Sequence, residues 1–165
     1  MNMHTILIPA AMIATICLLG PVLAETTVED DPEPTTWRVI ESGAYSHIEK
    51  ATRTVIQSQE DWHKWWNRHN TITEHIDGQK IKPAPPPVDF TEETVLTATV
   101  GRRSTGGYAI EFVRIHHEGD TLVSTLHMTA PGPEDMVTMA LTAPYTIIAI
   151  PKHDGPIRFV ENERR

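Results

Sequence analysis

The stretch GRRSTGGYAI, residues 101–110, combines glycines with cations in a way that suggests anion binding. Gly101 and Gly106 lie five positions apart, as in the first half of a phosphate-binding loop, with two arginines between them. Such a loop continues with lysine and then a helix whose N-terminus faces the phosphate. Here Gly107 follows Gly106, residues with strand character come next, and the glycine spacing of a dinucleotide fingerprint is absent. We therefore predict no phosphate or nucleotide cofactor.

The same stretch is predicted to be a turn between two strands. Gly106 and Gly107 permit a positive φ angle or a close approach of neighbouring backbone, and we expect a positive φ at one of them. Tyr108 would begin the next strand with its ring half-buried. Arg102 and Arg103 would point to solvent, free to meet an acidic surface of a partner.

The histidines and hydroxyls show no catalytic or metal-binding pattern. His63 and His69 are six positions apart, whereas two ligands on one helical face are usually four apart. His116 and His117 are neighbours, so a strand sends them to opposite faces. There is no G-x-S-x-G motif, and no base can be placed beside Ser104. The sequence predicts no metal site, no catalytic residue and no enzymatic activity.

The predicted hairpin register also argues against shared metal binding. The segment EGDT indicates a two-residue turn at Gly119–Asp120 between two β-rich runs. In that register His127 faces Phe112, which places His127 about 13 Å along the strand from His116. Metal ligands lie at roughly 2 Å from the ion, so these two histidines cannot share one.

Three tryptophans and a histidine mark the one predicted helix, at about 59–70. They recur at i, i+3, i+4 and i+7, and Ser58 precedes them as an N-cap residue. These residues are Trp62, Trp65, Trp66 and His69. The ring stripe has two interpretations, a buried helix face and an exposed platform for a carbohydrate or other small molecule. Because a helix must bury one stripe and large aromatic side chains carry most of that burial, the core interpretation is favoured.

The rest of the chain has β character. YTIIAI, residues 145–150, is apolar on both faces and predicts a central strand bracketed by Pro144 and Pro151. Further strands are expected at 37–43, 94–101, 108–117, 121–128, 136–142 and 153–160, with a hairpin or two short strands in 46–58 and a proline-rich connector at 82–90. The predicted fold is mainly β within the α+β class, an antiparallel sheet or small sandwich with one amphipathic helix.

The N-terminal region predicts export from the cytoplasm. Residues 6–24 form an apolar run that ends in Val22-Leu23-Ala24, which favours a cleaved signal peptide at 1–24 over an uncleaved anchor. The single cysteine, Cys17, lies in that run, so the remaining chain has no thiol. Residues 25–35 read as an acidic disordered leader, and residues 36–162 as one domain. The formal net charge of −8 argues against nucleic acid and, after signal cleavage, against a membrane. A periplasmic or secreted location is expected.

Several short motifs together resemble the PrcB family of bacterial protease-complex subunits, in its C-terminal domain. The resemblance spans residues 88–160, with Glu134 departing from the small residue expected after Pro-Gly-Pro. The motif residues are Thr105, Gly106, Gly107, Tyr108, Ile110, Pro131, Gly132, Pro133, Leu141, Thr142, Pro144 and Tyr145. The resemblance implies an accessory subunit of an extracytoplasmic protease complex without catalytic activity of its own.

Two functions follow as hypotheses. The first is a non-catalytic extracytoplasmic domain that binds another protein, with a protease as the candidate partner. The second is a periplasmic domain that binds a small molecule or carbohydrate through Trp62, Trp65 and Trp66. Burial of the tryptophans decides between them, since buried rings cannot form a binding platform.

Overall fold

The structure, a computed structural model, describes residues 33–70, 74–76, 79–81 and 83–164. They belong to the second of two compact units, Asp31–Arg165. The predicted signal peptide, residues 1–24, and most of the predicted leader lie outside these ranges. No helix within them is long and apolar enough to cross a membrane.

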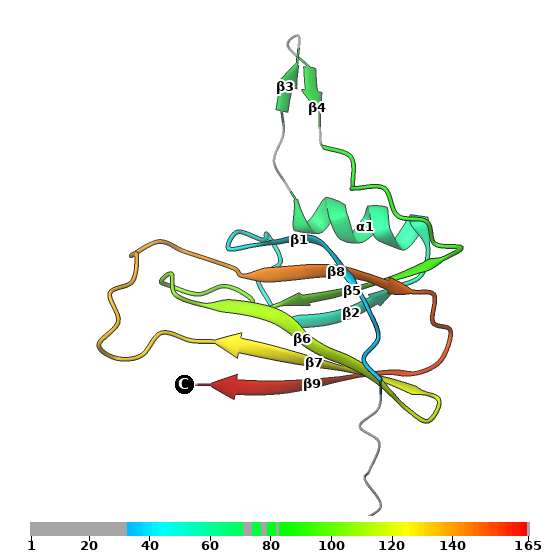
Figure 1. Cartoon of the computed structure of the whole chain (residues 1–165). Helices are drawn as coiled ribbons and strands as arrows, with labels where there is room; N and C mark the ends of the chain where they lie inside the picture. The colour runs from blue at the N-terminus through cyan, green and yellow to red at the C-terminus, as the bar shows by residue number, and fades with distance from the viewer. Residues whose placement is uncertain (1–32, 71–73, 77–78, 82, 165) are drawn as a thin grey trace, which may run out of the picture. The chain divides into compact units, whose positions relative to one another are not determined.

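Within these residues the chain forms one helix and strands that pair in three sheets (Figure 1). The elements are β1 Arg38–Gly43, β2 Thr52–Ile56, α1 Gln59–His69, β3 Glu74–Ile76, β4 Gln79–Ile81, β5 Glu93–Thr99, β6 Ala109–Glu118, β7 Thr121–Thr129, β8 Tyr145–Pro151 and β9 Ile157–Arg164. One sheet has the order β1-β8-β5-β2 and is antiparallel, a second has the order β6-β7-β9, and β3 and β4 form a hairpin. The prediction of a mainly β fold with one helix is confirmed.

Two hydrophobic cores lie on opposite faces of the four-stranded sheet. Leu96 of β5 and Ile148 of β8 belong to the core shared with β6 and β7. Their neighbours Val95 and Ile147 belong to the core shared with α1. The molecule is therefore layered as helix, four-stranded sheet and three-stranded sheet (Figure 1). This arrangement explains why YTIIAI is apolar on both faces and confirms its prediction as a central strand.

The tryptophan stripe of α1 is buried. Ser58 caps the helix by accepting a hydrogen bond from the Asp61 N–H at 3.2 Å, as the sequence indicates. Trp62, Trp65 and Trp66 are only 0%, 2% and 4% exposed, so the hypothesis of a tryptophan binding platform is wrong. Burying these large rings between helix and sheet stabilises the fold more than leaving them exposed to water would.

The proline-rich connector packs on the same tryptophans. The Trp62 indole N–H donates to the Pro86 carbonyl at 3.0 Å, and the Trp66 indole N–H donates to the Pro83 carbonyl at 3.1 Å. Prolines lack an N–H, but their carbonyls remain free to accept, so this segment satisfies the buried indole donors of Trp62 and Trp66. The connector is thus part of the helix layer as well as a crossover to β5.

A β-bulge shifts the predicted hairpin register by one residue. The turn is centred on Gly119 and Asp120 as predicted, but Val113 of β6 has no partner in the register, so His127 faces Glu111 and not Phe112. Without the bulge, strict alternation would direct Arg114 toward the core after Phe112. The extra residue places Ile115 there, fully buried, and thereby avoids burying a cation.

Three other strand predictions differ from the structure. Residues 136–142 form no strand, and Met136, Met139 and Leu141 are exposed at 102%, 87% and 57%. Their backbone bonds to the loop after β5 rather than to a sheet edge, as in the 2.9 Å bond from the Gly106 N–H to the Thr138 carbonyl. Residues 46–58 supply one strand, β2, not two, and β9 pairs with β7 in parallel, where an antiparallel pairing was expected.

We expect Trp65→Ala to lower the free energy of unfolding by about 3–5 kcal/mol, because its ring is almost fully buried between helix and sheet. Urea denaturation monitored by far-UV circular dichroism measures this change. Met136→Ala, at a fully exposed apolar residue, is the matched control and should leave stability within about 0.5 kcal/mol. An unchanged midpoint for Trp65→Ala would contradict the core assignment.

Candidate protein-binding groove

The motif residues gather where two loops meet at one end of the sheets. The first loop joins β5 to β6, and the second joins β7 to β8. Arg103 and Thr142 exchange backbone hydrogen bonds of 2.7 and 3.0 Å, and the Thr142 hydroxyl donates to the Thr105 carbonyl at 2.7 Å. Both loops carry the chain between the two sheets, so their mutual bonds hold the sheets together at this end.

The two motif glycines are required by space as well as by backbone conformation. Gly107 has a φ of 87°, which confirms the predicted positive φ at one of the pair. A Cβ on Gly107 would lie 2.9 Å from Val137 Cγ1 and 3.0 Å from Pro131 Cβ. A Cβ on Gly106 would lie 2.4 Å from Thr138 Oγ1. The glycines therefore let the second loop lie directly on the first.

The two arginines occupy different environments. Arg102 is exposed and pairs with Glu49 at 3.3 Å, in line with the expected solvent-facing position. Arg103 is half-buried and lies over the ring of Tyr108, 5.4 Å from its centroid, which differs from the expectation of a free cation. Tyr108 is half-buried, as predicted. The ring therefore shields the Arg103 guanidinium from water on one side.

The remaining motif residues shape the second loop. Pro131-Gly132-Pro133 forms a turn in which the Gly132 N–H donates to the Asp135 carboxylate at 2.7 Å. Pro144 and Tyr145 are buried at the start of β8, and the Pro144 carbonyl accepts from the Val100 N–H at 2.8 Å. These contacts position the loop ends and present no reactive group, which agrees with a structural role.

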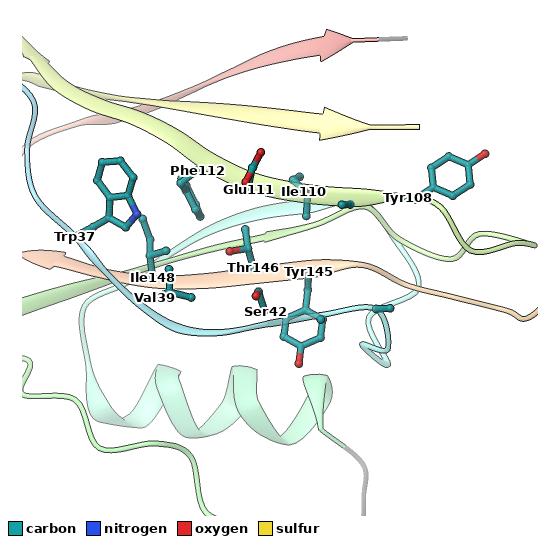
Figure 2. Close-up of a pocket in the computed structure, with 13 residues that line it drawn as sticks. Trp37, Val39, Ser42, Tyr108, Ile110, Glu111, Phe112, Tyr145, Thr146 and Ile148 are labelled. Carbon is teal, nitrogen blue, oxygen red and sulfur yellow. The ribbon is translucent and has the colours of Figure 1, made fainter. Parts of the chain in front are cut away.

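A groove of about 530 Å³ runs from this loop end along the gap between β6 and the edge strand β1 (Figure 2). Trp37 lies at one end and Tyr108 at the other (Figure 2). The side chains of Ile110 and Phe112 reach down from β6, and those of Thr146 and Ile148 reach up from β8 (Figure 2). All four are nearly or fully buried, so they form the floor.

The wall residues of the groove are more accessible than its floor. Val39 is 59% exposed, and Ser42, Ala109 and Glu111 are exposed as well. Glu111 is the one charged residue in the lining, and its carboxylate points away from the floor (Figure 2). The groove is thus an apolar cleft with open sides, a shape suited to binding and not to acid–base chemistry.

Sequence reasoning named Tyr108, Ile110 and Tyr145 but missed the other residues of this groove. Trp37, Val39 and Phe112 were interpreted only as strand residues. Which strand lies at a sheet edge depends on long-range pairing, which alternation does not encode. The position of β1 at the edge of its sheet therefore left no signal in the sequence.

A cluster of titratable side chains lies on the other face of β1 and β8. The Tyr145 hydroxyl donates to Glu41 Oε1 at 2.5 Å, and its ring meets the His69 imidazole edge-on with centroids 4.2 Å apart. His69 Nδ1 lies 3.0 Å from the Ser46 hydroxyl. Burial is the main cause that raises the pKa of Tyr145, and the hydrogen bond to Glu41 raises it further. Burial, helped by the nearby His47, lowers the pKa of His69 to about 4.

The Ser46–His69 pair is poorly suited to nucleophilic catalysis. A general base works best with a pKa near the working pH, and a pKa of about 4 makes His69 a weak base at neutral pH. Ser46 is buried, and its hydroxyl also accepts from the Ile48 N–H at 3.0 Å. Across the described ranges, no three His, Cys, Asp or Glu side chains come together as a metal site. The cluster reads as a buried hydrogen-bond network.

The fold defines a β-sandwich with a helix on one side, built around the two crossing loops. Residues 94–151 match the family model described as PrcB C-terminal, which confirms the resemblance carried by the motifs. The match covers nearly all of β5 and the whole of β6, β7 and β8, and with them both loops and the floor of the groove. No curated protein and no solved structure matches the chain.

We expect Gly107→Ala to lower the free energy of unfolding by about 2 kcal/mol, because it combines a positive φ with close contacts to Val137 and Pro131. Gly119→Ala is the matched control, since Gly119 has a φ of 61° but open space around it. It should cost only about 1 kcal/mol. Equal losses in chemical denaturation would show that loop packing adds nothing.

Stability should fall as the pH drops from 6.5 toward 4. The pKa of His69 lies at about 4 in the folded chain against 6.5 ordinarily, so the unfolded chain binds the proton more readily in this window. We expect a loss on the order of 2 kcal/mol in urea denaturation across it. His69→Gln should flatten the dependence, whereas His63→Gln, at an exposed helix position, should preserve it. An unchanged slope in His69→Gln would contradict this assignment.

Proposed function

We propose that this protein is a non-catalytic accessory domain that binds another protein outside the cytoplasm, as part of a protease complex. The observation that carries the proposal is the open apolar groove whose floor lies in the region that matches the PrcB C-terminal family. Exposed apolar surface is costly in water unless a partner covers it. The groove is elongated and open along its sides, which suits a polypeptide better than an enclosed small molecule.

The surface beside the motif loops supports protein binding further. Tyr45 and Leu141 are 69% and 57% exposed and line one common depression together with Arg102. Met136 and Met139, which are also exposed, lie in the same β7–β8 loop as Leu141 and add to its apolar surface. Aromatic, methionine and arginine side chains are the residue types enriched in protein interfaces.

The lining of the groove favours binding over catalysis. A hydrolase site needs a nucleophile beside a base and a donor for the developing charge. The groove floor offers aliphatic and aromatic side chains and one threonine hydroxyl. The polar network on the opposite face is buried, with His69 only 3% exposed. The apolar run at residues 6–24, which ends in Val22-Leu23-Ala24, supports an extracytoplasmic location.

We expect affinity purification of the tagged full-length chain from native cell-envelope extract to enrich an extracytoplasmic protease over an untagged strain. Quantitative mass spectrometry identifies the partner, and the half-life of that protease should shorten when the chain is deleted. Enrichment of proteins that include no protease would argue against the complex. Turnover of a general peptide or ester substrate by the purified chain would contradict the non-catalytic role.

A further inference from the structure

We propose that the groove is the vacant place of a strand, and that a partner protein fills it with an extended segment that pairs with the free edge of β6. This inference rests on the proposed function and specifies how the partner is held. It follows from how the two sheets lie on each other, from the exposure of β1, and from a contact that the chain already makes at the same edge.

The three-stranded sheet is one strand short of the sheet it covers. β6 packs on β8 and β5, and β9 reaches β2, where Arg53 and Glu161 pair at 2.8 Å. The order β6-β7-β9 therefore spans β8-β5-β2 of the other sheet. β1 lies beyond β8, where the three-stranded sheet has no counterpart.

The inward face of β1 shows this shortage directly. Val39 pairs with Ile148, and Ser42 pairs with Thr146, so these β1 residues face the same side of the sheet as the groove floor. Ile148 is 1% exposed because β6 covers it, whereas Val39 is 59% exposed. A fourth strand beside β6 would lie over Val39 and remove its apolar surface from water.

The edge of β6 that faces the groove is open over Ala109–Val113. Among the described residues, Ala109–Phe112 pair only with β7 on the other side, and Val113 is the unpaired residue of the bulge. Farther along the same edge the chain itself adds an extended contact, because the Thr35 N–H donates to the Ile115 carbonyl at 2.7 Å and Pro34 forms an antiparallel bridge with His116. This edge therefore already accepts extended backbone at Pro34 and Thr35. The groove leaves room for a further extended segment along Ala109–Val113.

The chemistry of the groove specifies the segment. About five residues fit, because Ala109–Val113 spans roughly 17 Å at strand rise, and Trp37 and Tyr108 close the two ends (Figure 2). Alternate side chains would be apolar, to cover the exposed side chain of Val39. The residue opposite Glu111, on the outer face, would be lysine or arginine, because opposite charges on neighbouring strands attract. The partner segment is thus an extended, alternating and basic peptide.

Selection from a library of random dodecapeptides displayed on phage, with the purified chain as bait, tests this proposal. Enriched peptides should alternate apolar and polar residues and carry a basic residue at one fixed position. A synthetic copy of the most enriched peptide should slow amide hydrogen exchange across Ala109–Val113 by about tenfold or more. Protection confined to the depression lined by Tyr45 and Leu141, or a selection that enriches no common pattern, would overturn the proposal.

Matched variants separate the groove from the rest of the surface. Val39→Asp places a charge at an exposed groove position and should weaken the peptide by about tenfold or more, whereas Met139→Asp, at an exposed apolar residue outside the groove, should not. Glu111→Lys should shift selection from a basic to an acidic residue at the fixed position. Equal weakening by Val39→Asp and Met139→Asp, or an unchanged charge preference, would overturn the proposal.

Two further outcomes are distinguishable. If a protease copurifies equally with the Val39→Asp chain, the proposed function stands, but the groove is not the site that binds the protease. Sedimentation of the chain alone shows whether a second copy fills the groove. A dimer that Val39→Asp dissociates would replace the partner segment with self-association, while a monomer at all concentrations agrees with a separate partner.

Discussion

Strands β5 and β8 must bury both of their faces, and the rest of the fold follows from that constraint. Val95 and Ile147 need a cover on one side, which α1 provides, while Leu96 and Ile148 need one on the other, which β6 and β7 provide. The chain must therefore cross between sheets after β5 and return before β8. Both crossings occur at the same end, so the loops that make them pack on each other. The residues that permit this packing are among the motif residues that carry the resemblance.

The same constraint explains why the chain combines a rigid interior with one unfinished side. The central strands are fully covered, but β1 is needed only to flank β8, and its own inner face gains nothing from the three-stranded sheet. Edge strands left open in this way are hazards for aggregation, and proteins usually blunt them with bulges or charge. β6 carries both, the bulge at Val113 and the carboxylate of Glu111, yet the groove beside it stays apolar. That combination limits unspecific pairing while keeping a specific site.

Much of the local structure could be predicted from the sequence, because it depends on neighbours along the chain. The capped tryptophan helix, the doubly apolar strand β8 and the glycine turn before Tyr108 are all signalled by spacing or residue type. The bulge was missed because its cause is the cost of burying Arg114, which appears only once the core is known. Residues 136–142 alternate like a strand, but their backbone bonds to the loop after β5. The groove exists only through pairing between distant segments.

The indole of Trp66 has a consequence for how this chain tolerates change in length. The Asn70 N–H donates to the Trp66 carbonyl at 2.8 Å, and the Trp66 ring donates to the Pro83 carbonyl. Asn70 and Pro83 are thus both held by Trp66, which fixes the two ends of the intervening segment close together. Doubling the number of residues in a loop adds only about 0.6 kcal/mol to the entropic cost of closing it. A change in the number of residues between Asn70 and Pro83 should therefore alter the free energy of unfolding only slightly.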